Sequence, residues 1–234
     1  PRLAAHAARS ARAARPDLAV HRLTLDRDLQ ASLEALVADR ARALGPRVSG
    51  AAVVVDVATG EILARVGSAG LLDETRGGFV DMTTAVRSPG STLKPFVYGL
   101  AFEAGIAHPE TLVEDRPTNF GGYAPRNFDS GYMGTVTARE ALQQSLNVPA
   151  VALLEAVGPM RLALRLGDVG ARLVLPTAEA PSLAVGLGGV GIRLVDLAAL
   201  YAGLVRGGVV PTLTESRDEE AAAGALASAG PAGR

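Results

Sequence analysis

The feature that most constrains this chain is its single lysine, Lys94, which follows Ser91 by three residues and comes just after a Ser88-Pro89-Gly90 turn. The other 22 cationic side chains are all arginine. Arginine stays charged at any ordinary pH, whereas a desolvated lysine can lose its proton and act as a base. Residues i and i+3 share one face of a helix. A helix that begins near Ser91 would therefore hold a hydroxyl beside an amine, and we expect the fold to provide one.

Composition narrows the classes of protein that fit this chain. It has 234 residues, 48% of them hydrophobic, and a mean hydropathy of +0.24, so it can bury a core and is not disordered. The net charge of −1 argues against nucleic acid as a main partner. The absence of cysteine excludes disulfides and thiolate metal sites. The histidines are too scattered for a metal ligand set, and we expect surface positions for His6, His21 and His108.

The beginning of the chain shows no targeting segment. Residue 1 is proline, no signal peptide is present, and no apolar run approaches the roughly 20 residues that span a bilayer. We therefore expect a fragment of a longer protein whose targeting segment, if there is one, lies outside these residues.

Patterning predicts a linker, a helix and a hairpin in the first part of the chain. Residues 1–20 are rich in Ala and Arg, which is typical of a linker. Residues 21–45 predict a short strand and then an amphipathic helix capped by Asp26. Two β-rich runs joined by a turn predict a hairpin, residues 51–57 and 61–66.

The rest of the chain predicts mainly helices. We expect four helices. One covers residues 91–105, one begins at the capping box Thr137-Ala138-Arg139-Glu140, one runs from Pro149 to Gly158, and one covers about 192–205. Ser145-Leu146-Asn147 then lies at a break between two helices, where side chains can point into a cleft. Residues 213–234 are acidic and then rich in Ala and Gly, which predicts a low-complexity, disordered tail.

Two short motifs carry a possible chemistry. Ser-x-x-Lys at Ser91 and Ser-x-Asn at Ser145 belong, with Lys-Thr-Gly, to the signature of penicillin-binding proteins and class A β-lactamases. Lys94 can serve as base for Ser91, because the helix dipole and apolar neighbours both favour its neutral amine. Ser145 can relay a proton, and Asn147 can bind a substrate amide or hold Lys94. Alternatively, Ser145 and Asn147 merely cap the helix near Pro149.

Longer blocks make the resemblance specific. Over about residues 20–210 the chain resembles the transpeptidase region of class A penicillin-binding proteins. The resemblance is carried by RSPGSTLKPF (87–96), DRP (115–117), YAPRNFD (123–129) and ALQQSLNVPA (141–150).

The resemblance implies a fold of the α+β type, the serine penicillin-binding and β-lactamase-like fold, with a helical subdomain and an incomplete antiparallel sheet over residues 46–212. It implies Ser91 as nucleophile, Lys94 as base, Ser145 as proton relay and Asn147 as substrate contact, without metal or organic cofactor. The implied substrates are the D-Ala-D-Ala ends of peptidoglycan stem peptides, and β-lactams as inhibitors. The implied place is the periplasmic face of the bacterial inner membrane, through an anchor outside these residues, with other cell-wall synthesis proteins as possible partners.

The sequence departs from the family pattern at the third motif. Lys-Thr-Gly cannot occur, because Lys94 is the only lysine. We therefore expect an incomplete transpeptidase domain, and two alternatives stay open. One is a catalytically disabled remnant, and the other is a carboxypeptidase or β-lactamase on the same fold. Gly186-Leu187-Gly188-Gly189-Val190-Gly191 matches the glycine pattern of a dinucleotide-binding domain, although close packing beside the active-site helix explains these glycines better.

The segment 108–134 predicts a long surface excursion rich in Gly, Pro, Asn and Asp. The loop contains three aromatic side chains, Tyr123, Phe128 and Tyr132. They either pack within the loop or form one wall of the peptide groove. The resemblance implies the groove wall, and we favour it. We expect Asp115 and Asp129 to fix the loop rather than to catalyse.

Overall fold

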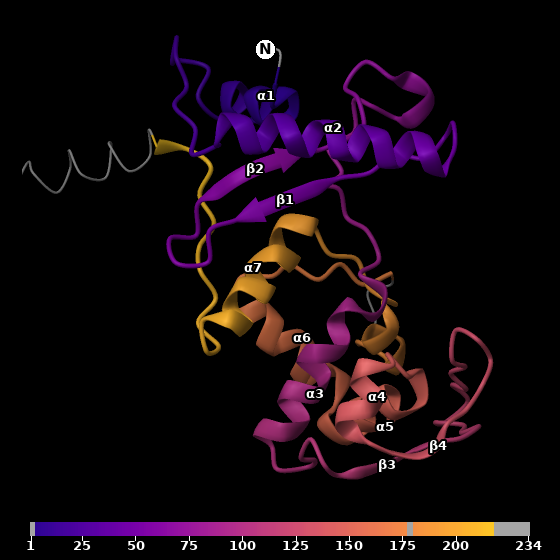
Figure 1. The fold of residues 1–234 in the computed structure, drawn as a ribbon. Coiled ribbons are helices and arrows are strands. Elements are labelled where there is room, and N and C mark those ends of the chain that lie inside the picture. Colours follow the sequence, from indigo (N-terminus) through magenta and orange to yellow (C-terminus); the bar gives the residue numbers. More distant parts are fainter. Residues whose placement is uncertain (1–2, 177–179, 218–234) are drawn as a thin grey trace, which may run out of the picture. The chain divides into compact units, whose positions relative to one another are not determined.

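The computed structural model describes residues 3–176 and 180–217, and the chain falls into two compact units (Figure 1). The first unit combines residues up to Ala85 with those from Arg193 onward, and the second comprises Val86–Ile192.

The first unit is a hairpin covered by helices. Strand β2 pairs antiparallel with β1, with Ala52 opposite Val66, as the sequence predicts. Helix α2 packs on β2 and helix α7 on β1, and Figure 1 shows the hairpin between them. The elements of this unit are α1 (Ala5–Ala14), α2 (Arg27–Leu44), β1 (Ala52–Val55), β2 (Ile62–Val66) and α7 (Leu194–Val205).

The predicted linker at the N-terminus contains α1. The prediction that His6 lies at the surface is wrong. His6 is only 7% exposed, and its Nε2 lies 3.0 Å from the Gly78 carbonyl oxygen. The ring packs against Gly67, where a Cβ would lie 2.7 Å from it. A glycine at the end of β2 thus makes room for a side chain that the sequence pattern assigned to the surface.

A buried arginine organises this unit. Arg65 on β2 is 6% exposed and forms ion pairs with Asp81 and with Glu215, the latter at 2.6 Å, while its Nε donates to Thr83 at 2.9 Å. Residues 213–217, predicted as part of a disordered tail, are therefore ordered. The amide of Thr24 donates to the Glu215 carbonyl at 3.0 Å. The rest of that predicted tail, residues 218–234, lies outside the described residues.

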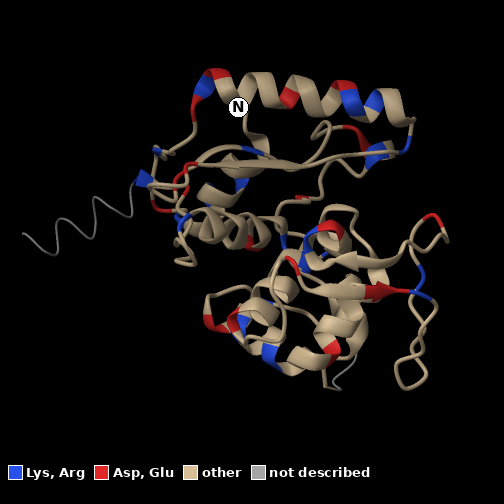
Figure 2. Ribbon diagram, turned by 60° about the horizontal axis from the view of Figure 1, so that its bottom comes forward, with Lys and Arg blue, Asp and Glu red and all other residues tan. Residues whose placement is uncertain are grey.

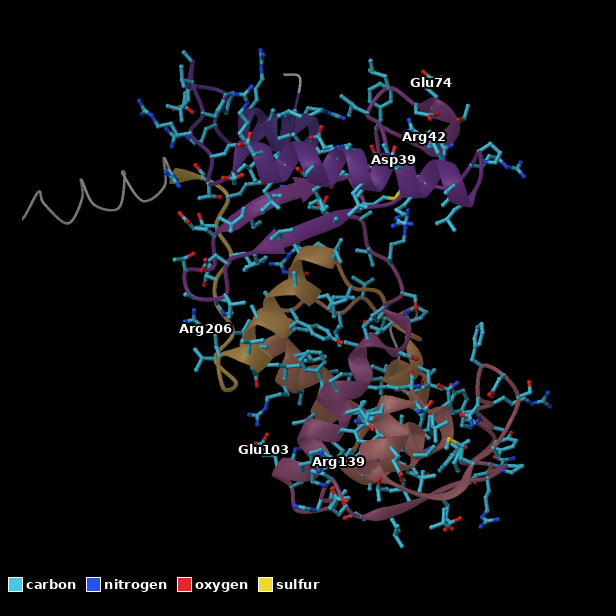
Figure 3. All side chains as sticks on the ribbon, viewed as in Figure 1. Asp39, Arg42, Glu74, Glu103, Arg139 and Arg206 are labelled. Carbon is cyan, nitrogen blue, oxygen red and sulfur yellow. The ribbon has the colours of Figure 1, made fainter. Side chains whose placement is uncertain are left out.

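Most other charged side chains of this unit lie at its surface. Figure 2 shows both signs interspersed along α2, where Arg42 pairs with Asp39 and both side chains are more than half exposed. Arg206, at the end of α7, donates to the carbonyls of Val57 and Ala58 at 2.8 and 2.6 Å (Figure 3). That contact fixes the hairpin turn to α7.

The second unit is built around one apolar helix. Helix α5 is apolar on nearly every side, so it lies buried, in contact with α3, α4, α6 and β3. Its elements are a 3₁₀ turn (Gly90–Leu93), α3 (Lys94–Glu103), β3 (Leu112–Asp115), β4 (Gly134–Thr137), α4 (Ala138–Gln143), α5 (Asn147–Val157), α6 (Pro159–Asp168) and a second 3₁₀ turn (Leu183–Leu187).

Three features of this unit differ from the predictions. The segment 108–134 contains β3, which pairs with β4 in register Leu112 to Thr137. On the outward face Thr135 donates to Glu114 at 2.8 Å. Leu112 is exposed and Asp115 is buried, so β3 lacks the alternation of buried apolar and exposed polar residues. Helix α6 follows α5 directly after Gly158. Helix α5 begins at Asn147, two residues before the predicted start at Pro149, while the capping box at Thr137 opens α4 as expected.

The glycines at 186–191 serve close packing. Gly188 has φ +90°, and a Cβ there would lie 2.5 Å from the Gly90 backbone, at the start of the Ser91 turn. This confirms the packing interpretation. The segment opens within a 3₁₀ turn, Leu183–Leu187, and not after a strand, so the strand–turn–helix unit of dinucleotide sites is not formed here.

No single helix in the described part of the chain is long and apolar enough to cross a membrane, and α5 and α6 meet that test only as a pair bent by 81°.

Arg65→Met is expected to lower the free energy of unfolding by about 3 kcal/mol, because it leaves two largely buried carboxylates, each about 16–17% exposed, without their cation. Arg42→Met removes an exposed pair and is the matched control, expected to leave unfolding unchanged. Urea denaturation followed by circular dichroism measures both. Equal effects of the two variants would contradict the assigned role of Arg65.

Candidate active site

The site begins where the chain enters α3. The Lys94 amide donates to the Ser91 carbonyl, closing an i to i+3 turn. In a 3₁₀ turn, side chains at i and i+3 eclipse each other. Ser91 and Lys94 therefore project from the same side, with Ser91 exposed and Lys94 only 1% exposed. The Ser88 hydroxyl donates to the Gly188 carbonyl at 2.6 Å, which fixes the turn to its neighbour.

Lys94 lies in a polar pocket made by the Ser145–Asn147 segment. Its Nζ donates to the Ser145 carbonyl at 2.5 Å, to Ser145 Oγ at 3.1 Å and to Asn147 Oδ1 at 2.6 Å. Burial lowers the pKa of Lys94 from 10.5 to about 8. The neutral fraction at pH 7 thereby rises by about two orders of magnitude.

Ser145 holds a backbone conformation that glycine usually occupies. It follows α4 with φ +54°, its amide donates to Leu142 at 3.0 Å, and the Leu146 amide donates to Ala141 at 2.9 Å. These two bonds form a Schellman motif, in which glycine is the usual left-handed residue. A serine there costs about 1 kcal/mol. In return, both its hydroxyl and its carbonyl reach Lys94.

Asn147 opens α5 and is held at two points by the preceding loop. Its amide donates to Asn127 Oδ1 at 2.7 Å, and its Nδ2 donates to the Arg126 carbonyl at 2.5 Å. The first bond satisfies an N–H that a helix start leaves without an intrahelical partner. With Nδ2 committed to a carbonyl, Asn147 Oδ1 must face Lys94.

These residues border a groove of about 790 Å³ within the second unit. It is lined by Ser91, by the Ser145–Asn147 segment and by a loop that includes Phe128, Tyr132 and Met133. Phe128 is fully exposed, at 106% of its reference area. Among the described residues the Ser91 hydroxyl has no hydrogen-bond partner, so it is free to turn toward a molecule in the groove.

The pocket accommodates both protonation states of Lys94. An ammonium donates three hydrogen bonds, and the pocket supplies three acceptors. A neutral amine donates only two and offers a lone pair. The Ser145 hydroxyl can then turn and donate to that lone pair, because a hydroxyl is both donor and acceptor. The arrangement is therefore suited to receive and pass on a proton.

The structure brings together all four candidate residues of the sequence analysis. Ser145 and Asn147 contact Lys94 directly, and Ser91 lies at the groove. Phe128 and Tyr132 line the groove, whereas Tyr123 does not. Asp115 and Asp129 do fix the loop, Asp129 by accepting from Gly131 at 3.0 Å.

The residues that hold Asn147 in place do not stand out in the sequence. Asn127 and the Arg126 carbonyl lie within the YAPRNFD block, but no feature of the block marks them. Their partners lie about 20 residues away along the chain, and no periodicity connects them. The block itself was the only available signal.

Comparisons with known proteins identify relatives of this arrangement. The family model described as "Penicillin binding protein transpeptidase domain" matches residues 50–217. Penicillin-binding protein 1C of Escherichia coli (strain K12) is 46% identical over 209 residues, covering 89% of this chain and 27% of the relative. Penicillin-binding protein 1F of Bacillus subtilis is 41% identical over 110 residues, covering 47% and 15%. The chain thus spans about a quarter or less of these relatives.

Solved structures agree with this at the level of the fold. The penicillin-binding protein PonA1 from Mycobacterium tuberculosis superimposes with a TM-score of 0.72, at 22% identity over 91% of this chain and 59% of that one. The PonA1 complex with penicillin V gives 0.66, at 23% identity over 84% and 54%. The predicted α+β fold class is confirmed.

The buried lysine should leave a signature in the pH dependence of stability. The folded state binds the Lys94 proton less tightly than the unfolded state, so stability rises with pH between about 8 and 10.5. From pH 7.5 to 9.5 the unmodified chain should gain about 2 kcal/mol relative to Lys94→Met. The comparison stays below pH 10, because burial also raises the pKa of Tyr98 and the titration of that group would add its own change in stability at higher pH. Parallel urea-denaturation profiles of the two proteins would contradict this prediction.

Proposed function

The chain belongs to the penicillin-binding protein transpeptidase family, and we propose that it is a serine acyltransferase acting on D-Ala-D-Ala ends of peptidoglycan stem peptides. Ser91 is the nucleophile, Lys94 the base, Ser145 the proton relay and Asn147 a substrate contact. The observation that supports this most strongly is the Lys94 amine, buried and bonded to Ser145 and Asn147 at the groove that contains Ser91.

The proposed reaction has two acyl transfers. Ser91 Oγ attacks the carbonyl carbon of the penultimate D-Ala as its proton passes to neutral Lys94. The tetrahedral intermediate collapses, the C–N bond breaks, and the leaving nitrogen takes a proton from Lys94 through Ser145. An amine of a neighbouring strand then attacks the acyl-enzyme ester, forms the new amide and returns the proton to Ser91. A β-lactam enters the first step alone, because its leaving nitrogen stays tethered in the adduct.

Neutral Lys94 sets the rate of the first step in this scheme. An ammonium cannot accept the Ser91 proton, so only the deprotonated fraction is competent. A pKa of about 8 keeps that fraction substantial near neutral pH without making the amine too weak a base.

The substrate chemistry also supports a location. Peptidoglycan lies outside the bacterial inner membrane, so the domain would work at its periplasmic face, with an anchor supplied outside these residues. Other proteins of cell-wall synthesis would be its neighbours there.

Intact mass spectrometry after incubation with benzylpenicillin tests the proposal. The unmodified chain should gain the mass of one penicillin, and Ser91→Ala should gain none. Thr92→Ala is the matched control, because its exposed hydroxyl is adjacent and it should still be labelled.

The lifetime of the adduct separates the alternatives. An adduct that persists for hours fits a transpeptidase, whereas hydrolysis within seconds would favour a carboxypeptidase or β-lactamase on the same fold. A folded chain that gains no mass would contradict activity at Ser91 and favour a disabled remnant, which the absence of Lys-Thr-Gly allows.

A further inference from the structure

A buried carboxylate lies behind the site. Asp115, the last residue of β3, has no exposed surface, and no cation pairs with it among the described residues. It accepts instead from Asn127 Nδ2, at 2.9 Å to each oxygen, and from the Met133 amide at 2.8 Å. A buried charge without a counter-ion is costly unless hydrogen bonds satisfy it, so these contacts are strong constraints on the loop.

The carboxylate fixes which way the Asn127 amide faces. Asn127 is 6% exposed, and its Nδ2 meets only acceptors, namely the two Asp115 oxygens and the Gly131 carbonyl at 2.9 Å. Its Oδ1 meets only a donor, the Asn147 amide at 2.7 Å. A flipped amide would set donor against donor at Asn147 and acceptor against acceptor at Asp115. The orientation therefore follows from the hydrogen-bond partners.

The same loop determines the position of Asn147. Asn127 holds the Asn147 backbone, and the neighbouring Arg126 carbonyl holds the Asn147 side chain at 2.5 Å. The remaining amide oxygen of Asn147 then lies 2.6 Å from Lys94 Nζ. A continuous line of hydrogen bonds thus runs from Asp115 through Asn127 and Asn147 to Lys94.

We propose that Asp115 is a positioning residue for the reaction, which acts through Asn127 to hold Asn147 against Lys94. It touches neither substrate nor the reacting atoms. The positioning role in catalysis rests on the proposed function, whereas the effect on Lys94 can be measured without it.

Asp115→Asn breaks the line while changing little else in shape. The new amide keeps one oxygen as an acceptor but replaces the other with a donor that opposes Asn127 Nδ2, which weakens the contact. A compensating flip of Asn127 would place a donor opposite the Asn147 amide. Asn127→Asp is the reciprocal change, which sets two carboxylates against each other. The double variant Asp115→Asn with Asn127→Asp restores a donor between the two side chains and an acceptor for Asn147. It loses the bond to Gly131, whose carbonyl then faces a carboxylate oxygen, but it regains the contacts at 115 and 147 and should be milder than either single change.

Tyr98→Phe is the matched control. The Tyr98 hydroxyl is buried without a hydrogen-bond partner among the described residues, and the Asp115 charge adds to burial in raising its pKa. The variant therefore alters the surroundings of the same carboxylate without touching Asn127.

Lys94 provides a direct readout, because a chain labelled with ¹³C-lysine gives one lysine side-chain signal. In Asp115→Asn we expect Asn147 to loosen, water to reach the amine, and the pKa of Lys94 to rise from about 8 to about 9. Benzylpenicillin acylation of Ser91 should slow about tenfold. Tyr98→Phe should retain the original value and rate, and the double variant should recover part of both.

The outcomes are distinguishable. A folded Asp115→Asn that keeps both the Lys94 pKa and the acylation rate would overturn the positioning role. A double variant worse than both single variants would also overturn it. If the unmodified chain takes no penicillin, the proposed function fails, and the Lys94 titration still decides the link to Asp115. If Asp115→Asn does not fold, Asn127→Ala carries the same expectation, because it removes the bond to Asn147 and leaves Asp115 in place.

Discussion

The buried amine of Lys94 is the group around which the candidate site of the second unit is arranged. Lys94 can stay out of water only because Ser145 and Asn147 supply three acceptors for it. Supplying them requires a strained serine at the end of α4 and an asparagine at the first residue of α5. Removing any one of these acceptors would leave a buried donor without a partner. The break between α4 and α5 therefore forms the polar pocket that binds the Lys94 side chain.

Backbone features outside this pocket also help to position Ser91 and Ser145. Gly188 lacks a Cβ where one would meet Gly90, so the turn that carries Ser91 can approach its neighbour closely. The capping box at Thr137 starts α4 at Ala138, which fixes the place of Ser145 seven residues later. Glycines and helix caps thus set the backbone positions of Ser91 and Ser145. The hydrogen bonds to Lys94 then explain which side chains stand at the α4–α5 break.

The fold class follows from the sequence, whereas the roles of the candidate site residues stay a prediction. Ser91, Lys94, Ser145 and Asn147 could be proposed because their spacing suggests a chemistry, and the structure brings them to one groove. The hairpin at 52–66, the cap at Thr137 and helix α7 could be found from periodicity and turn residues. Strands β3 and β4 could not, because each has only four residues and β3 exposes the apolar Leu112 while it buries the polar Asp115. The burial of His6 and the Arg65–Glu215 pair depend on partners far along the chain, which no local pattern encodes.

The central claim is that burial tunes Lys94 to act as a base, and an NMR titration of the ¹³C-lysine-labelled chain tests it most directly. Since the chain has one lysine, its side-chain carbon shift reports this group alone. The structure predicts a midpoint at about pH 8. A midpoint at the ordinary value of 10.5 would show a solvated ammonium, and would contradict Lys94 as the base that activates Ser91.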